Sequence, residues 1–375
     1  MSLLAFLGAA RIAEIVAQIP DNRLNPSGGR WDERVPSRDG DTGDILGRDA
    51  AVPLAADILA RDGRSRDVQE PSIVLEVQKA AKINSSIRLT ESDVELLHRL
   101  VRTGGADRVD RAALISRLAR MIERRRQSVA ITRGLLKAGM ALGDFSYARL
   151  GVKTGGSIDF GMPSTLKIVP ATFWYGAGGA ANLAATPISD LTAADVASDI
   201  LGGAPYDSIE LSQVAYNAMV STTEYKNAAT GRIAVYNTAS LPPVGTADSY
   251  ALAGTVLNRK ISITENRYQY QDETGATLTG RYVPAHMPIL YRSTDVARNL
   301  NWEWVNTPVI QSSVAALGGS DAFGGEVVRG PVEYVSYDAH EFTWVRFHCI
   351  QEGAPVRRDR TVTARFRVAS SESGA

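Results

Sequence analysis

The strongest pattern along the chain is a helical one between Asp110 and Gly139. Apolar residues share one face of this segment at Leu114, Ile115, Leu118, Met121, Ile122, Val129 and Leu136. A single apolar stripe of this kind is typical of an amphipathic helix. We expect one helix roughly 45 Å long, with arginines on its other faces and a weak point at Gly134.

After residue 145 the pattern changes to short alternating runs separated by turn residues. Runs on either side of Gly155-Gly156 and of residues 272–275 predict two hairpins. One short helix is predicted to start at Thr192, and another after Ser212 as its N-cap residue. Residues 327–368 are predicted to be mostly strand, with one apolar face made by Val362, Ala364, Phe366 and Val368.

The N-terminal part of the chain is different. Residues 1–19 have near-helical apolar spacing and predict an amphipathic helix that ends before Pro20. Residues 21–67 hold eight arginines, ten acidic residues, six glycines and three prolines. Such a segment buries little surface alone, so it is either disordered or an arm ordered by its neighbours. Residues 71–89 are predicted to be extended, and a short helix is predicted to follow from Thr90.

Charge is unevenly distributed along this chain of 375 residues, although 41 basic and 41 acidic side chains balance in total. Residues 109–150 carry 9 basic and 3 acidic side chains, residues 151–356 carry 12 and 19, and residues 357–375 carry 5 and 2. The neutral total therefore excludes only a uniformly basic nucleic-acid binder. We find no run of about 20 apolar residues that could span a bilayer, so no membrane association is expected.

Candidate catalytic chemistry is sparse, and we predict no enzyme, no cofactor and no metal site. The single cysteine, Cys349, excludes an internal disulfide framework and fits a reducing, intracellular compartment. We expect Cys349 to be a buried small hydrophobe. The histidines lack the spacing of a zinc motif. Residues 37–44 lack ligands that a calcium loop requires, and the glycines of 176–181 lack the strand-to-helix context of a phosphate loop.

Several segments, in their order along the chain, resemble lambda-type major capsid proteins of tailed phages, the major capsid protein E family. The long helix ERRRQSVAITRGLLKAG (123–139) is followed by a hairpin ending in SIDFG (157–161). Upstream lies EVQKAAKINSSIRLTESDVELL. Downstream, DSIELSQVAYNAMVST, RYQYQDETGATLTGRYVP and GAPVRRDRTVTARFRV resemble later units of that family. The resemblance covers most of residues 70–368, and the first 70 residues match little.

The resemblance implies an α+β fold, the tailed-phage major capsid fold. An N-terminal arm would occupy residues 1–40, and an extended β-hairpin called the E-loop would occupy 41–89. A peripheral domain, built on the long spine helix at about 110–139, would combine 90–160 with 330–375. An axial domain would occupy 161–329. Both basic segments would then lie in the peripheral domain.

The function implied is self-assembly into hexamers and pentamers of an icosahedral shell around double-stranded DNA, without covalent chemistry. The expected location is the virion, assembled in the cytoplasm of a bacterial host. Expected partners are further copies of the chain, with scaffold, portal and decoration proteins and non-specific contact to the packaged DNA. Candidate residues facing DNA or an acidic scaffold are Arg124, Arg125 and Arg126, although a solvated helix face explains them equally well. Candidate intersubunit contacts of the arm and E-loop are Arg61, Arg64 and Arg66, paired with acidic residues of segment 151–356.

Three alternatives stay open at the level of sequence. An encapsulin-type nanocompartment shares the fold and would hold cargo protein in place of DNA. A soluble β-rich binding module and an unrecognised enzyme are the other two. Large shells or capsomers in solution would favour a capsid or a nanocompartment. A monomer would favour a binding module or an enzyme.

Overall fold

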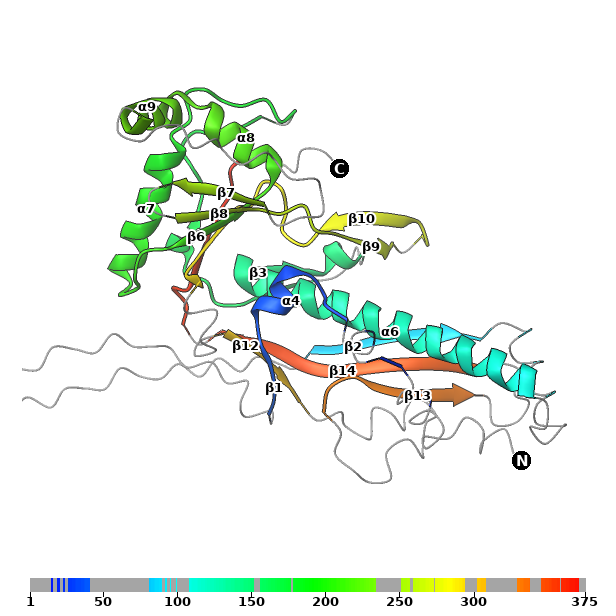
Figure 1. Ribbon diagram of the computed structural model, residues 1–375. Helices are drawn as coiled ribbons and strands as arrows, with labels where there is room; N and C mark the ends of the chain where they lie inside the picture. Colours follow the sequence, from blue (N-terminus) through cyan, green and yellow to red (C-terminus); the bar gives the residue numbers. More distant parts are fainter. Residues whose placement is uncertain are drawn as a thin grey trace, which may run out of the picture. The chain divides into compact units, whose positions relative to one another are not determined.

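The computed structural model describes most of the second half of the chain and separate parts of the first (Figure 1). The described residues are 15, 19–20, 23, 26–40, 81–89, 92, 95, 99, 108–151, 156–176, 178–233, 251–256, 259–272, 274–293, 302–307, 329–337, 345–357 and 359–370. Most of the predicted N-terminal helix and residues 41–80 of the predicted E-loop lie outside this set.

The described chain divides into two compact units. Unit 1 contains the described residues up to 40, those from 81 to 137 and those from 303 to 355. Unit 2 contains the described residues from 138 to 302 and from 356 to 370. The division crosses the long helix near its end, so the last turn of that helix belongs to unit 2.

Unit 1 is built from one long helix, a short helix and a sheet. Its elements are α4 (Arg30–Arg34), β1 (Ser37–Asp39), β2 (Ala81–Arg88), α6 (Arg108–Leu142), β12 (Trp302–Asn306), β13 (Val332–Tyr337) and β14 (Val345–Arg357). The strand order is β1-β12-β14-β13, and β2 also pairs with β14. The partners β2 and β13 are antiparallel to β14, whereas β1 runs parallel to β12.

The long helix predicted from the sequence is confirmed as α6. Its length of 35 residues corresponds to about 52 Å. The predicted stripe is its buried side: Leu118, Ile122, Val129 and Leu136 are each at most 4% exposed. On β14, every residue from Phe347 to Val356 is buried, including Cys349 as expected. Both faces of this strand are therefore covered.

Unit 2 holds a six-stranded mixed sheet, two hairpins and three helices among its described elements. These are β3 (Asp144–Ser146), η2 (Tyr147–Leu150), β4 (Ser157–Asp159), η3 (Ser164–Leu166), β5 (Lys167–Ile168), α7 (Pro187–Ile200), β6 (Ser208–Leu211), α8 (Gln213–Ser221), α9 (Thr223–Ile233), β7 (Ala251–Val256), β8 (Arg259–Ile263), β9 (Arg267–Gln271), β10 (Thr277–Arg281), β11 (Ile289–Tyr291) and β15 (Thr363–Phe366). The six-stranded order is β5-β15-β11-β6-β8-β7.

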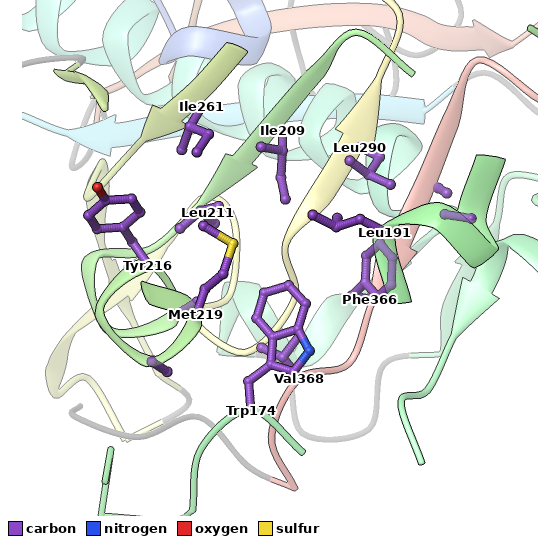
Figure 2. Close-up of a cluster of buried hydrophobic side chains, with 14 of the residues drawn as sticks. Trp174, Leu191, Ile209, Leu211, Tyr216, Met219, Ile261, Leu290, Phe366 and Val368 are labelled. Carbon is purple, nitrogen blue, oxygen red and sulfur yellow. The ribbon is translucent and has the colours of Figure 1, made fainter. Parts of the chain in front are cut away.

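The core of unit 2 lies between this sheet and helices α7 and α8. Figure 2 shows Leu191 of α7 and Met219 of α8 in one cluster with Leu211 of β6, Leu290 of β11 and Phe366 of β15. Each of these five side chains is at most 1% exposed. Segments far apart in the sequence therefore share one hydrophobic core.

Both predicted hairpins of unit 2 are confirmed. Strand β3 pairs antiparallel with β4, and β9 pairs antiparallel with β10. The second turn has Gly275 at φ 83°, a backbone angle that glycine adopts without strain. Ser212 is confirmed as the N-cap of α8, since its hydroxyl accepts a hydrogen bond from the Ala215 amide at 3.1 Å.

The predicted start of the helix at Thr192 is wrong, because α7 begins at Pro187. The proline occupies the first turn, where its missing N–H is not needed. The next two amides, of Ile188 and Ser189, donate to the carboxylate of Glu224 at 2.7 and 3.1 Å. Thr192 instead bonds back to the Ile188 carbonyl at 3.0 Å, as a residue inside a helix does.

Strand β15 lies in unit 2, where it pairs with β5 and β11. Ala364 and Phe366 of this strand and the flanking Val362 and Val368 are all buried, as the alternation predicted. The compact units follow the contacts within each part of the chain, and the expected peripheral and axial domains stay a prediction.

The C-terminal end of α6 is capped by residues from the other end of the chain. The last turn of α6 holds no basic residue. The buried guanidinium of Arg357 donates to the Met140 carbonyl at 3.4 Å and also to the carbonyls of Asp359 and Thr363. Burial lowers the pKa of Arg357 to about 10, and the group stays a cation at neutral pH. Arg357 therefore donates to a carbonyl at the end of α6 that has no partner within the helix. Its positive charge also compensates the negative end of the helix dipole.

We expect Arg357→Met to lower the free energy of unfolding by about 2 kcal/mol, because methionine fills the space but leaves buried carbonyls without donors. Urea unfolding of the purified chain measures this. The control is Arg367→Met at an exposed position, where the expected change is below about 0.5 kcal/mol. Equal effects of the two substitutions would contradict the capping role.

Candidate functional site

The candidate site is the surface of α6 in unit 1, where the sequence placed its arginines. The three arginines Arg124, Arg125 and Arg126 do not share one environment, since successive helical residues point in different directions. Arg124 is exposed, whereas Arg125 and Arg126 are half-buried. The guanidinium of Arg125 donates to the Ser86 carbonyl at 3.2 Å and to Ser85 Oγ at 3.4 Å, both on β2.

Arg125 therefore holds β2 against α6. Burial lowers the pKa of its guanidinium, and the neighbouring charge of Arg124 adds to this effect. The other three candidates, Arg61, Arg64 and Arg66, lie outside the described residues. Their proposed contacts with neighbouring subunits stay predictions.

A second feature of α6 is its contact with residues 26–40, which we call the arm clamp. Here α4 lies against the C-terminal half of α6, and the backbones meet at Gly28 and Gly134. A Cβ atom added to Gly134 would lie 1.8 Å from the Gly28 carbonyl oxygen, and one added to Gly28 would lie 1.8 Å from that of Ala130. Gly134, the expected weak point of the helix, is therefore also the residue that permits this contact.

Charged groups reinforce the clamp beside this contact. Asp32 is paired with Lys137 at 2.7 Å and with Arg133 at 2.6 Å, and the carboxylate also accepts from the Gly28 amide at 2.8 Å. The side chains of Asp32 and Lys137 are only 4% and 1% exposed. Two cations thus share one buried carboxylate.

The electrostatics of the cluster follow from burial and from these contacts. Burial alone would raise the pKa of the Asp32 carboxyl, but the hydrogen bond from Arg133 and the charge of Lys137 outweigh it and lower the pKa. Burial lowers the pKa of Lys137 to about 8, against the attraction of Asp32. The Lys137 ammonium also donates to the Val35 carbonyl at 2.6 Å and to Ser37 Oγ at 3.2 Å.

The clamp continues along β1 to the sheet. Arg38 forms an ion pair with Glu303 of β12, with one Nη2–Oε1 distance of 3.0 Å. Asn306 of β12 donates to Asp39 at 3.0 Å and accepts from Gln351 of β14 at 2.8 Å. Gln351 in turn accepts from Arg133 at 3.3 Å. Polar contacts therefore connect the arm, α6, β12 and β14.

This cluster is hard to predict from the sequence for a physical reason. Asp32 lies in a segment so rich in charge that no single carboxylate stands out. Lys137, however, gave a usable signal, because it is the one charged residue between Gly134 and Leu142. A lysine in an apolar run that is to be buried needs a partner of opposite charge.

Neither a metal site nor a membrane-spanning helix occurs in the described residues. They contain no cluster of three or more histidine, cysteine or acidic side chains that could hold a metal ion. Among the same residues, no helix has both the length and the apolar character that crossing a bilayer requires. The main chemical features of the described residues are therefore the cation-rich helix α6 and the arm clamp on it.

The class of fold is that of phage capsid proteins: an α+β chain with a long helix over one sheet and a second sheet with its own helices. The crystal structure of a protein assigned as the capsid protein of a prophage of Escherichia coli CFT073 matches with a TM-score of 0.54. The match has 9% sequence identity and covers 97% of this chain and 99% of that one. The predicted fold class is therefore confirmed.

Two other solved structures give weaker matches. One, from Mycobacterium phage Patience, has a TM-score of 0.43 at 12% identity and covers 100% of this chain and 88% of that one. The other is an encapsulin from Synechococcus elongatus PCC 7942, with a TM-score of 0.41 at 8% identity over 89% and 85% of the two chains. The fold assignment rests on the prophage protein. No protein-family model and no curated protein matches this chain.

Proposed function

We propose that the chain is a major capsid protein that assembles into hexamers and pentamers of an icosahedral shell enclosing double-stranded DNA. The observation that carries this proposal is the match to the prophage capsid protein over nearly the whole of both chains. The role needs no catalytic group, cofactor or metal. The location that follows is the virion, with assembly in the bacterial cytoplasm.

The subunit is suited to shell building because its parts are held by internal contacts. Helix α6 is a straight support about 52 Å long, and the arm clamp and Arg125 attach two other segments to it. Contacts between copies are individually weak when they are exposed ion pairs, about 1 kcal/mol or less. A subunit that keeps its shape lets many such contacts add up in a closed shell.

The domain assignment is part of this proposal. The arm is residues 1–40, the E-loop 41–89, the peripheral domain 90–160 with 330–375, and the axial domain 161–329. The arm clamp supports an arm that follows its own spine helix over residues 26–40. Scaffold, portal and decoration proteins, and the contacts of Arg61, Arg64 and Arg66, are the further partners and contacts we propose to test.

Electron microscopy of the purified full-length chain tests the function. We expect capsomers or shells of megadalton mass, which size-exclusion chromatography detects independently. A chain that stays monomeric at all concentrations would contradict the proposal and favour a binding module. Shells purified from the natural host that hold protein cargo in place of nuclease-resistant DNA would identify a nanocompartment.

A further inference from the structure

Strand β10 has an open edge. It pairs with β9 in a two-stranded sheet, and the described residues place no further strand beside it (Figure 1). Thr277, Leu278 and Thr279 are all exposed, so neither face of this part of the strand is covered. Proteins commonly protect such an edge with a lysine, a proline or a bulge, and residues 277–280 contain none of these. We call the outward side of Thr277–Thr279 the β10 edge.

The hydrogen bonds of the hairpin show which backbone groups point outward. The Tyr282 amide donates to the Asn266 carbonyl at 3.2 Å, so these two residues form a hydrogen-bonded pair. Hydrogen-bonded and non-hydrogen-bonded pairs alternate along antiparallel strands. The register of β10 with β9 is continuous. Thr277 and Thr279 therefore belong to non-hydrogen-bonded pairs and direct their N–H and C=O groups away from β9.

Contacts at the end of β10 confirm this direction and fix the strand. The Arg149 guanidinium of η2 donates to the carbonyls of Arg281 and Tyr282 at 2.8 and 2.6 Å. The Arg281 carbonyl thus points outward, as the alternation requires, and it is already occupied. The hydroxyl of buried Tyr268 on β9 donates to the Arg149 carbonyl at 2.5 Å. The β10 edge is therefore a strand template whose position is set before any partner binds.

We propose that the β10 edge pairs antiparallel with the same edge of a second copy of the chain. The pairing is centred on Leu278 and places Thr277 of each copy opposite Thr279 of the other. Each of these opposed pairs exchanges N–H···O bonds in both directions, so the outward groups of both strands are satisfied. The two Leu278 side chains meet in a non-hydrogen-bonded pair, where Cα atoms are about 4.5 Å apart.

A second copy fits this edge because its outward groups match themselves in one register. A pairing centred on Thr279 would need the Arg281 carbonyl, which is already occupied. A pairing centred on Thr277 would need Gly275, whose amide is bonded within the turn. The segment Thr277–Gly280 carries no charge, so no like charges oppose each other, and opposed threonines are favourable.

The pairing also covers an apolar side chain. Leu278 is 42% exposed, and it is the one exposed large hydrophobic residue among the described residues of this hairpin. Contact with its copy across the two-fold axis removes part of this surface from water. A self-complementary contact of this kind relates exactly two copies. The inference goes beyond the proposed function, because it names one contact between two copies and the register of that contact.

Disulfide trapping with the purified full chain tests the pairing. In Leu278→Cys the two introduced thiols would face each other, with Cα atoms inside the range of about 4.4 to 6.8 Å that a disulfide spans. We expect mild oxidation to give a covalent dimer on a non-reducing gel. The native Cys349 is buried, and the wild type gives the background. The matched control Gln269→Cys, exposed on β9 of the same hairpin, should stay at that background.

A second pair of variants acts on the backbone. Thr279→Pro, combined with Leu278→Cys, removes an outward N–H and leaves the bonds to β9 in place. Each dimer then loses two donors, so we expect the association constant to fall by about 30-fold. Gln269→Pro removes the outward N–H of the residue opposite Thr279 on β9 and should leave the dimer yield unchanged. Circular dichroism verifies that both variants are folded.

The outcomes separate this inference from the capsid function. Dimers of Leu278→Cys that form no faster than those of Gln269→Cys would overturn the self-pairing, whether or not shells form. An unchanged dimer yield with Thr279→Pro would overturn it too. A covalent product with a different protein would reject a second copy as the occupant. Self-pairing in a chain that forms neither capsomers nor shells would contradict the capsid function and leave the inference standing.

Discussion

Replacing Gly134 with alanine should destabilise the protein, although the same change in an ordinary helix interior stabilises it by about 1 kcal/mol. The sign reverses because the new Cβ would lie 1.8 Å from the Gly28 carbonyl oxygen, a backbone atom that cannot move alone. Residues 26–40 would have to leave α6, and the ion pairs of Asp32 would separate with them. We expect a loss of about 3 kcal/mol.

Two measurements check this result. Urea unfolding gives the free energy, and hydrogen exchange detected by mass spectrometry reports whether residues 26–40 lose protection. Gly156→Ala is the matched control, because no atom lies within 4 Å of a Cβ added there. Stabilisation by Gly134→Ala, or unchanged protection of the arm, would show that the close contact does not exist in solution.

Replacing Asp32 with asparagine should cost about 3 to 5 kcal/mol, the range found when one partner of a buried ion pair is removed. Lys137, at 1% exposure, and Arg133 would then face each other without a carboxylate between them. Asparagine keeps the size and shape of the side chain, so packing is not the cause of the loss. Glu33→Gln, at an exposed position on α4, should change stability by less than about 0.5 kcal/mol.

The same cluster predicts a dependence on pH. The pKa of Asp32 in the folded chain lies below its ordinary value of 3.8. Its contribution to stability is therefore complete above that value and is lost as pH falls through the lower, folded-state pKa. We expect the difference in unfolding free energy between wild type and Asp32→Asn to shrink on acidification below pH 3.8. A difference that stays constant down to pH 2 would contradict this assignment.

The elements that are determined by residues close together in the chain could be predicted well from the sequence. The apolar stripe of α6, the hairpin at Gly275 and the Ser212 cap depend on residues close together in the chain, and the structure confirms all three. The start of α7 failed because its cap is the carboxylate of Glu224, on another helix. No local pattern contains that information.

The site was predicted less completely than the fold. The sequence predicts the cation-rich helix and favours three consecutive arginines, but exposure divides these between different environments. Residues 21–67 read in the sequence as one charged segment. Within it, α4 and β1 are ordered by partners that lie about 100 and 265 residues further along the chain. Interactions over such separations appear only when the tertiary structure is known.

The long separation between the arm and its partners has a consequence for synthesis. Residues 26–40 leave the ribosome early, yet Asn306, which bonds to Asp39, is 267 residues later. At about 5 to 20 residues per second, the arm waits roughly 13 to 50 s for that partner. A nascent or truncated chain cannot close the clamp at β12 and β14. The part of the clamp on β1 therefore forms only after residue 306 has been translated.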